Sequence, residues 1–189
     1  EGRRVIGDPH EHAVRYANEG ADELLYMDIV ATLYGRNQLT DLLERTTEDV
    51  FIPVTVGGGI KCLSDVKRLF DSGADKVAVN TAALHNPSLI TEIAQKYGNQ
   101  AIVVSIEAKR VNGGWEAYTD NGRERTGKDA IKWAFEAQKL GAGEILLTSI
   151  DQEGTRKGVD LDLIKAIGPK LNIPVVISGG VGCPEHIKE

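Results

Sequence analysis

Short apolar runs alternate along the chain with segments in which apolar residues recur every three or four positions. The runs predict strands at 23–29, 52–56, 76–79, 102–106, 144–150 and 173–177. Helical spacing predicts helices at about 9–18, 39–48, 63–72, 87–97, 128–140 and 161–170. Runs such as Ile102-Val103-Val104 are typical of parallel sheets that are buried on both faces. The pattern therefore predicts an α/β fold, either a closed barrel or an open doubly wound sheet.

An internal repeat favours the closed barrel. The segment from Gly20 to Ile29 matches the segment from Gly141 to Ile150, which begins 121 residues later. The same offset places Gly58-Gly59 on Gly179-Gly180. Because one unbroken offset covers strand, helix and glycine turn, we expect two copies of a four-strand half that together form a (β/α)8 TIM barrel.

Only six of the eight strands of such a barrel are expected within these residues. Adding the offset of 121 residues to the strand at 76–79 gives a position beyond the last residue. Subtracting the same offset from the strand at 102–106 gives a position before the first residue. We therefore expect residues 1–189 to form a single incomplete barrel domain, strands two to seven, that lacks the first and last strands. Because open sheet edges invite association, the chain is expected to be a fragment of a longer product or to be completed by another chain, and the first interpretation is preferred.

The composition narrows the classes of partner. A net charge of −6 argues against nucleic acid or an anionic membrane. Two cysteines and four histidines follow no ligand spacing, so neither a metal nor a disulfide framework is predicted. No apolar run approaches the roughly 20 residues of a membrane span, and no signal peptide is recognised. These features predict a soluble, cytoplasmic protein.

Glycine-rich turns follow two predicted strands that the repeat relates. Gly58 and Gly59 follow one strand, and Gly179 and Gly180 follow its counterpart. Glycine lets the backbone approach a ligand and direct N–H groups at an anion. Short polar pairs follow two other strands, Asn80-Thr81 and Gly154-Thr155. The glycines could simply make tight turns, but their symmetric placement favours two phosphate sites and an elongated ligand with a phosphate at each end.

The predicted strand at 102–106 leads to a candidate catalytic carboxylate. Period-two alternation places Val103, Ser105 and Glu107 on one face, with the acidic residue nearest the active-site end. Partial burial would raise the pKa of such a carboxylate and suit it to general acid or base catalysis. The alternative is an ion pair with Lys109 or Arg110.

Further acidic and aromatic side chains lie near the predicted strand ends. Asp28 is a second catalytic candidate, for which a structural hydrogen bond is equally consistent with the sequence. Glu153 would place a negative charge beside the proposed phosphate unless its side chain turns away or accepts hydrogen bonds from loop N–H groups. Glycines in the segment 113–122 predict an inserted hairpin. Its Trp115 and Tyr118 could close over a ligand or pack within the hairpin.

Taken together, these motifs resemble the cyclase subunit of imidazole glycerol phosphate synthase. The resemblance covers essentially the whole chain and is carried by Asp22 to Ile29, Thr55 to Ile60, Ala74 to Ala83, Ile106 to Arg110, Gly141 to Ile150 and Ser178 to Gly180. It implies a cofactor-independent lyase of histidine biosynthesis. Such an enzyme uses ammonia from a glutaminase partner to convert a bisphosphate ribulosyl ribotide into imidazole glycerol phosphate and an aminoimidazole carboxamide ribotide.

The chain departs from the family pattern at the catalytic residues. The family uses aspartates at the ends of barrel strands one and five. The first of these would precede residue 1, and the second position is Glu107, which is one methylene longer. Because active sites commonly need geometry to within about half an ångström, this change could weaken or redirect the chemistry.

The resemblance also implies a docking face for the glutaminase at the amino-terminal ends of the strands. Glu23, Asp75, Lys76 and Glu144 match the family's charged positions there, and Lys76 and Glu144 are implied to gate ammonia. The internal repeat relates Glu23 to Glu144, so folding symmetry alone could explain that pair.

Other functions stay open at this point. The segments 27–37 and 119–123 also resemble a paralogous branch that amidates sugars in surface polysaccharide synthesis. A non-catalytic barrel that binds phosphate or activates a glutaminase is a third hypothesis. The related isomerase of histidine synthesis shares the two-phosphate barrel, but it fits the motifs around Glu107 and Gly154 less well.

Overall fold

The computed structural model describes residues 7–28 and 38–188 of the chain. The chain forms two compact units, residues 1–77 and 78–189. The first contains α1 (Pro9–Asn18), β1 (Leu24–Met27), α3 (Gln38–Asp49), β2 (Val54–Gly57) and α4 (Leu63–Asp71), and β3 (Lys76–Val79) crosses the boundary.

The second unit is the larger of the two. Its helices are α5 (Thr81–His85), α6 (Ser88–Tyr97), α7 (Ala130–Leu140) and α8 (Leu161–Ile167), with short 3-10 helices η1 (Asn99–Ala101), η2 (Gly168–Lys170) and η3 (Pro184–Ile187). Its strands are β4 (Ile102–Val111), β5 (Gly114–Thr119), β6 (Glu124–Asp129), β7 (Glu144–Ser149) and β8 (Val175–Ser178).

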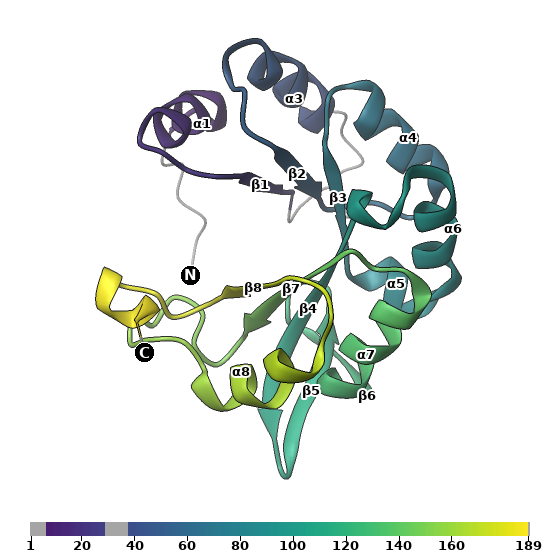
Figure 1. Cartoon of the computed structure of the whole chain (residues 1–189), viewed down its shortest axis with the longest axis vertical. Helices are drawn as coiled ribbons and strands as arrows, with labels where there is room; N and C mark the ends of the chain where they lie inside the picture. Colours follow the sequence, from purple (N-terminus) through teal and green to yellow (C-terminus); the bar gives the residue numbers. More distant parts are fainter. Residues whose placement is uncertain (1–6, 29–37, 189) are drawn as a thin grey trace. The chain divides into compact units, whose positions relative to one another are not determined.

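In the first unit, β1 and β2 pair in parallel, and α1 and α3 lie along them (Figure 1). The helix α1 begins at Pro9 because the Asp8 carboxylate accepts a hydrogen bond from the His10 N–H at 2.9 Å. The Tyr26 hydroxyl on β1 lies 3.0 Å from the Thr46 hydroxyl on α3 and donates to the Pro9 carbonyl at 3.3 Å. One tyrosine therefore fastens both helices to the strand.

In the second unit, β4, β7 and β8 form a parallel sheet with β7 in the middle. Val103 and Leu146 pack with Ala78 on one face of these strands. The helix α7 contributes Trp133, which is 1% exposed, to the packed interior. Burial on both faces explains why the strands read as continuous apolar runs in the sequence.

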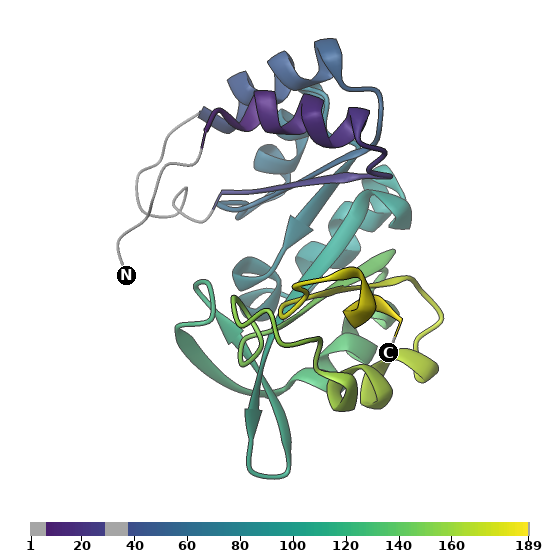
Figure 2. The ribbon, with the colours of Figure 1, turned by 90° about the vertical axis from the view of Figure 1, so that its left-hand side faces the viewer.

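From Glu107 onward, β4 is one arm of an antiparallel hairpin with β5, and β6 pairs with β5 (Figure 2). The predicted hairpin is confirmed, but the strand β6 was not predicted. Its residues are mostly polar and exposed, so they carry no apolar alternation. The strand is fastened instead by the buried Glu116, whose carboxylate accepts from Arg125 at 2.8 Å and from the Gly127 N–H at 2.8 Å.

The two halves of the internal repeat have the same strand register. Leu24 of β1 is paired with Val54 of β2, and their counterparts Ile145 and Val175 are paired in β7 and β8. The backbone bonds that precede these pairs also correspond, with N···O distances of 2.9 Å for Leu24 to Pro53 and 3.0 Å for Ile145 to Pro174. The sequence offset of 121 residues is therefore also a structural repeat.

The six predicted strands and six predicted helices all occur, with ends that differ by a few residues. Ile29 and the rest of the segment 29–37 lie outside the described residues. The structure adds α5, which begins directly after β3 and buries Ala83 and Leu84. Five residues are too few to show helical spacing, so this helix forms through packing that the local sequence does not reveal.

Within the described ranges, no helix is both long and apolar enough to cross a membrane. In the same ranges, histidine, cysteine, aspartate and glutamate side chains do not gather in threes that could hold a metal ion.

The close contact between Gly58 and the Asp28 backbone gives a stability prediction. A Cβ atom there would lie 2.1 Å from the Asp28 carbonyl oxygen, and φ is +103°. We expect Gly58→Ala to lower the free energy of unfolding by about 1–3 kcal/mol more than Gly20→Ala, because inserted atoms strain a packed site. Gly20 is a matched control, since its φ is +94° but a Cβ would meet nothing within 4 Å. Urea unfolding measures both, and equal losses would contradict the clash.

Candidate functional site

Glu107 lies where the parallel part of β4 ends. It is paired with Thr148 of the neighbouring strand β7. Ser105 and Val103 precede it on the same face and are 4% and 3% exposed. Glu107 itself is only half-buried. The strand therefore leads from a closed interior to a carboxyl group at the edge of solvent, as its alternation predicts.

The electrostatic surroundings of Glu107 favour its protonated form. Burial raises the pKa of this carboxyl above its ordinary value of 4.5, and the charges of Asp120 and Glu153 raise it further. A hydrogen bond from the Gly122 backbone acts in the opposite direction. The buried Oε2 atom has no hydrogen-bond partner among the described residues. Such a carboxyl keeps its proton to a higher pH than an ordinary glutamate, which suits a role as general acid or base.

The basic neighbours of Glu107 are engaged elsewhere. The Arg110 guanidinium lies 2.9 Å from the Asp160 carboxylate, and the Lys109 ammonium lies 5.6 Å from the centre of the Tyr118 ring. Neither interaction involves Glu107. The alternative of an ion pair between Glu107 and one of these residues therefore finds no support in the geometry.

A cavity of about 350 Å³ lies beside the loop that follows β7 and the turn that follows β8. Its lining residues are Glu153, Gly154, Arg156, Ile177, Ser178, Gly179, Gly180 and Val181. Three of the four residues expected at this phosphate site therefore meet at one cavity. Thr155 is not among the lining residues, and its hydroxyl and N–H donate to the Gln152 carbonyl at 2.8 Å and 3.0 Å.

The glycines of the cavity also meet a packing requirement. A Cβ atom on Gly179 would lie 2.8 Å from the Ser149 carbonyl oxygen, and one on Gly180 would lie 1.9 Å from the Gly158 carbonyl oxygen. The Gly158 N–H donates to the Gly180 carbonyl at 2.9 Å. The close approach of the loops therefore requires glycine at both positions, and a role of these glycines in phosphate binding stays a prediction.

Two charged side chains of opposite sign line the cavity. Glu153 does not turn away from it, since a Cβ atom on Gly179 would lie 3.4 Å from the Glu153 Oε2 atom. Arg156 is also among the lining residues and carries the opposite charge. The sequence reasoning missed Arg156, although the basic pair Arg156-Lys157 directly after Gly154-Thr155 was a signal that could have revealed it.

Asn80 and Thr81 connect the end of β3 to the hairpin. The Asn80 side-chain amide donates to the Tyr118 carbonyl at 3.3 Å, and the Thr81 hydroxyl accepts from the Asp120 N–H at 3.2 Å. The Asn80 Oδ1 atom is buried and has no hydrogen-bond partner among the described residues. Buried polar atoms are rarely left unsatisfied, so a ligand group is a reasonable partner for it. Tyr118 is 7% exposed and packs within the hairpin.

Gly58, Gly59 and Asp28 belong to the first unit. Asp28 directly follows β1, and its N–H donates to the Gly57 carbonyl at 2.9 Å. Gly58 and Gly59 directly follow β2 and have φ values of +103° and +67°. Their joint action with residues of the second unit stays a prediction, as does the catalytic pairing of Asp28 with Glu107.

The charged residues expected on the partner face occupy the starts of strands. The Lys76 ammonium lies 2.8 Å from one carboxylate oxygen of Glu23, and the Thr55 hydroxyl donates to the other. Asp75 instead accepts a hydrogen bond from the Val54 N–H at 2.8 Å, and thereby helps to align β2 with the start of β3. Glu23 and Lys76 are thus an ion pair, while Asp75 has at least a structural role.

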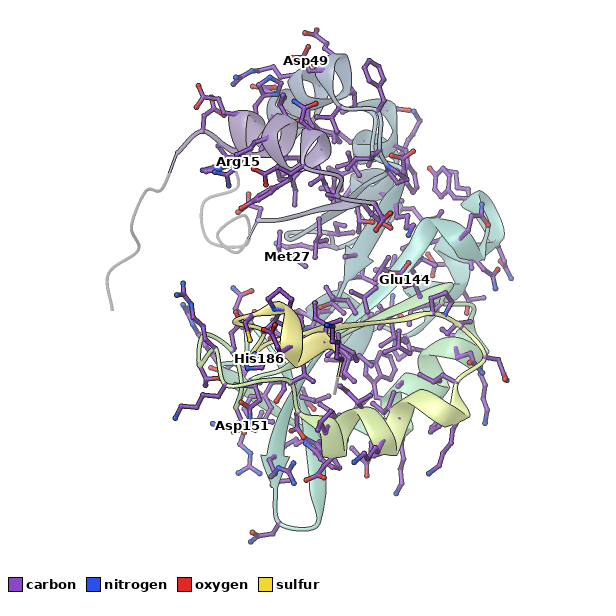
Figure 3. All side chains as sticks on the ribbon, turned by 60° about the vertical axis from the view of Figure 1, so that its left-hand side comes forward. Arg15, Met27, Asp49, Glu144, Asp151 and His186 are labelled. Atoms are coloured by element: carbon purple, nitrogen blue, oxygen red, sulfur yellow. The ribbon has the colours of Figure 1, made fainter. Side chains whose placement is uncertain are left out.

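Glu144 occupies the corresponding place in the second unit. It is the first residue of β7, whereas Asp151 lies just past the other end of this strand (Figure 3). The cavity loop also follows that other end. Glu144 is therefore a full strand length away from the cavity side of β7, which is the arrangement expected of a partner-face residue.

Comparisons with known proteins agree with this geometry. The family described as "Histidine biosynthesis protein" matches residues 1–189. The chain is 60% identical over 183 residues to "Imidazole glycerol phosphate synthase subunit HisF" of Legionella pneumophila, which covers 96% of this chain and 86% of that protein. It is 52% identical to the HisF subunit of Sulfurisphaera tokodaii and 50% identical to that of Dehalococcoides mccartyi. The chain spans 74% and 73% of these two relatives.

The raised pKa of Glu107 predicts a pH-dependent stability difference for Glu107→Gln. Because the folded state binds this proton more tightly than the unfolded state, the wild-type protein loses stability as pH rises from 4.5 through the raised pKa. We expect the glutamine variant to be more stable than wild type at neutral pH, and the difference to vanish below pH 4.5.

Urea unfolding across a pH series measures this difference. Glu136→Gln, which changes an exposed glutamate on α7, is the matched control and should show no such trend. A Glu107→Gln difference that does not vary with pH would contradict the raised pKa.

Proposed function

Because this chain belongs to the histidine biosynthesis protein family and is a relative of the HisF cyclase subunits, we propose that it forms imidazole glycerol phosphate from a bisphosphate ribulosyl ribotide and ammonia. The second product is an aminoimidazole carboxamide ribotide. The single observation that carries the proposal is the half-buried Glu107 carboxyl, which has an unpartnered oxygen and a raised pKa.

Several expectations from the sequence are confirmed by the family. The resemblance to the cyclase subunit of imidazole glycerol phosphate synthase is confirmed at 50–60% identity. The α/β fold of the (β/α)8 barrel class is confirmed by the match over residues 1–189. The chain is an enzyme of the lyase class in histidine biosynthesis. All three relatives are HisF subunits, which favours this function over sugar amidation or a non-catalytic barrel.

Glu107 is proposed as the group that moves protons. Addition of ammonia to a ketose carbonyl requires a proton for the oxygen that leaves as water, and closure of the ring requires a base. A carboxyl with a raised pKa can perform both steps in turn. The two charges that raise this pKa, on Asp120 and Glu153, therefore support the proposal. Asp28 is kept as the second candidate for proton transfer.

One phosphate of the substrate is proposed to bind in the cavity lined by Gly154, Gly179 and Gly180, with the Arg156 guanidinium pairing with its charge. Thr155 stays a candidate from the sequence only, because its hydroxyl and its backbone N–H both donate to the Gln152 carbonyl. The repeat-related turn with Gly58 and Gly59 is proposed to bind the other phosphate, and Asn80 and Thr81 are separately proposed as phosphate-binding residues. The assignment of the turn rests on the shared register of the two halves.

A glutaminase subunit is proposed as the source of ammonia. The relatives are named as subunits of a synthase, which implies a partner for them. On this chain the proposed contact residues are Glu23, Asp75, Lys76 and Glu144, at the amino-terminal ends of their strands. The ion pair of Lys76 with Glu23 would have to open for ammonia to pass. The cytoplasm is the proposed location, since histidine biosynthesis there would supply both the substrate and the glutamine.

The catalytic proposal predicts graded effects of substitutions at Glu107. We expect Glu107→Ala to lower kcat with ammonium salt and the bisphosphate ribotide by about 10²–10⁴-fold, because general acid–base catalysis contributes that much. Glu107→Asp should retain activity, since the family's usual residue is aspartate. Product formation followed by absorbance measures both variants.

Binding of inorganic phosphate is the control for these variants. Equal phosphate affinity in wild type and Glu107→Ala would show that the site is intact. If Glu107→Ala then turned over at the wild-type rate, Glu107 would have no catalytic role.

The phosphate proposal predicts a binding defect for Arg156→Ala. Loss of one charged partner should raise KM for the ribotide about tenfold with little change in kcat, because charged hydrogen bonds contribute about 1.5–3 kcal/mol. Lys157→Ala is the matched control, since this exposed neighbour does not line the cavity. Steady-state kinetics compares the two variants. Identical KM values for Arg156→Ala and wild type would remove Arg156 from the site.

A further inference from the structure

Asp160 is a buried carboxylate that receives hydrogen bonds from four different elements. It is 7% exposed. Its Oδ1 atom accepts from the Arg110 guanidinium of β4 at 2.9 Å and from the Leu163 N–H of α8 at 3.1 Å. Its Oδ2 atom accepts from the Trp115 indole N–H of β5 at 3.2 Å and from the Ser149 hydroxyl at the end of β7 at 3.4 Å.

The position of Asp160 in the chain ties these contacts to the cavity. Ser149 and Asp160 bracket the loop 150–159, which carries Glu153, Gly154 and Arg156 of the cavity lining. The bond between Ser149 and Asp160 therefore closes the base of that loop. A second tie reaches the same loop, because the Arg110 N–H donates to the Asp151 carboxylate at 2.7 Å.

The hairpin beyond Glu107 supplies the outer part of this arrangement. Arg110 and Trp115 are directly paired across β4 and β5, and the guanidinium lies 4.8 Å from the centre of the indole ring. Both side chains then reach the same carboxylate. Trp115 therefore does more than pack within the hairpin, since its N–H connects the hairpin to the cavity loop.

These contacts exceed what a helix cap requires. Asp160 is the N-cap of α8, a role that needs one side-chain acceptor and that serine or asparagine fills equally well. Burying a carboxylate is costly unless its oxygens are fully hydrogen-bonded. Four donors from β4, β5, β7 and α8 meet that condition and also fix these elements relative to one another.

We infer that Asp160, with Arg110 and Trp115, forms a positioning clamp that holds the cavity loop 150–159 in place beside the strand that carries Glu107. The inference deepens the proposed function, on which it rests. The clamp keeps one phosphate of the substrate at a set distance from the carboxyl that moves the proton. It also keeps Glu153 close to Glu107, so that loosening the clamp changes the protonation of Glu107.

Trp115→Phe and Asp160→Asn test the clamp in the intact protein. Phenylalanine keeps the ring over Arg110 but removes the N–H donor, and asparagine keeps the helix cap but removes the charge. We expect each variant to weaken binding of inorganic phosphate and to raise KM for the ribotide by about fivefold or more, the equivalent of one hydrogen bond. The acidic limb of the kcat–pH profile should also move to lower pH, because Glu153 recedes from Glu107.

Asp162→Asn is the matched control. Asp162 binds the same guanidinium at 3.1 Å, but its side chain is 69% exposed and lies outside the bracketed loop. The Asp162→Asn substitution should leave phosphate affinity, KM and the pH profile unchanged.

Two results would overturn the clamp. One is a Trp115→Phe variant that folds and matches wild type in phosphate affinity, KM and pH profile. The other is an Asp162→Asn variant that is as impaired as Asp160→Asn. If Asp160→Asn does not fold, Trp115→Phe decides the question. If wild type shows no turnover but Trp115→Phe still weakens phosphate binding, the proposed function fails and the clamp stands.

Discussion

The close approach of a glycine to the carbonyl end of the neighbouring strand is the constraint on which the site depends. It occurs twice, at Gly58 against Asp28 and at Gly179 against Ser149. The pairs β1–β2 and β7–β8 have the same register. In each pair, the chain that leaves β2 or β8 therefore passes the end of its neighbour, β1 or β7. Only glycine has room there, and the crossing leaves a turn whose backbone can meet an anion. In the second unit the cavity of about 350 Å³ forms at this crossing.

The charges of the second unit are arranged so that Glu107 stays unpaired. Arg110 is held by the buried Asp160, and Lys109 lies over the Tyr118 ring. The charges close enough to affect Glu107, Asp120 and Glu153, are both negative. An arginine three residues from a carboxylate would ordinarily lower its pKa, so the clamp at Asp160 has an electrostatic consequence as well as a positional one.

The two copies of the internal repeat have the same strand register but differ in their side chains. Ser149 occupies the position that corresponds to Asp28, and Val176 the position that corresponds to Thr55. Parallel pairing depends on backbone groups and tolerates such changes, whereas proton transfer depends on side chains. A duplicated scaffold can therefore preserve two glycine turns while different side chains occupy the repeated positions.

The sequence by itself determined the alternation of strands and helices, the half-barrel repeat, the glycine turns and the position of Glu107 at a strand end. These features follow local periods of two and 3.6 residues, or an offset that can be read along the chain. Only the tertiary structure decided that β6 forms, that Arg156 lines the cavity and that Arg110 binds Asp160 rather than Glu107. The physical reason is separation along the chain. Arg110 and Asp160 lie 50 residues apart, and packing rather than local pattern chose the partner.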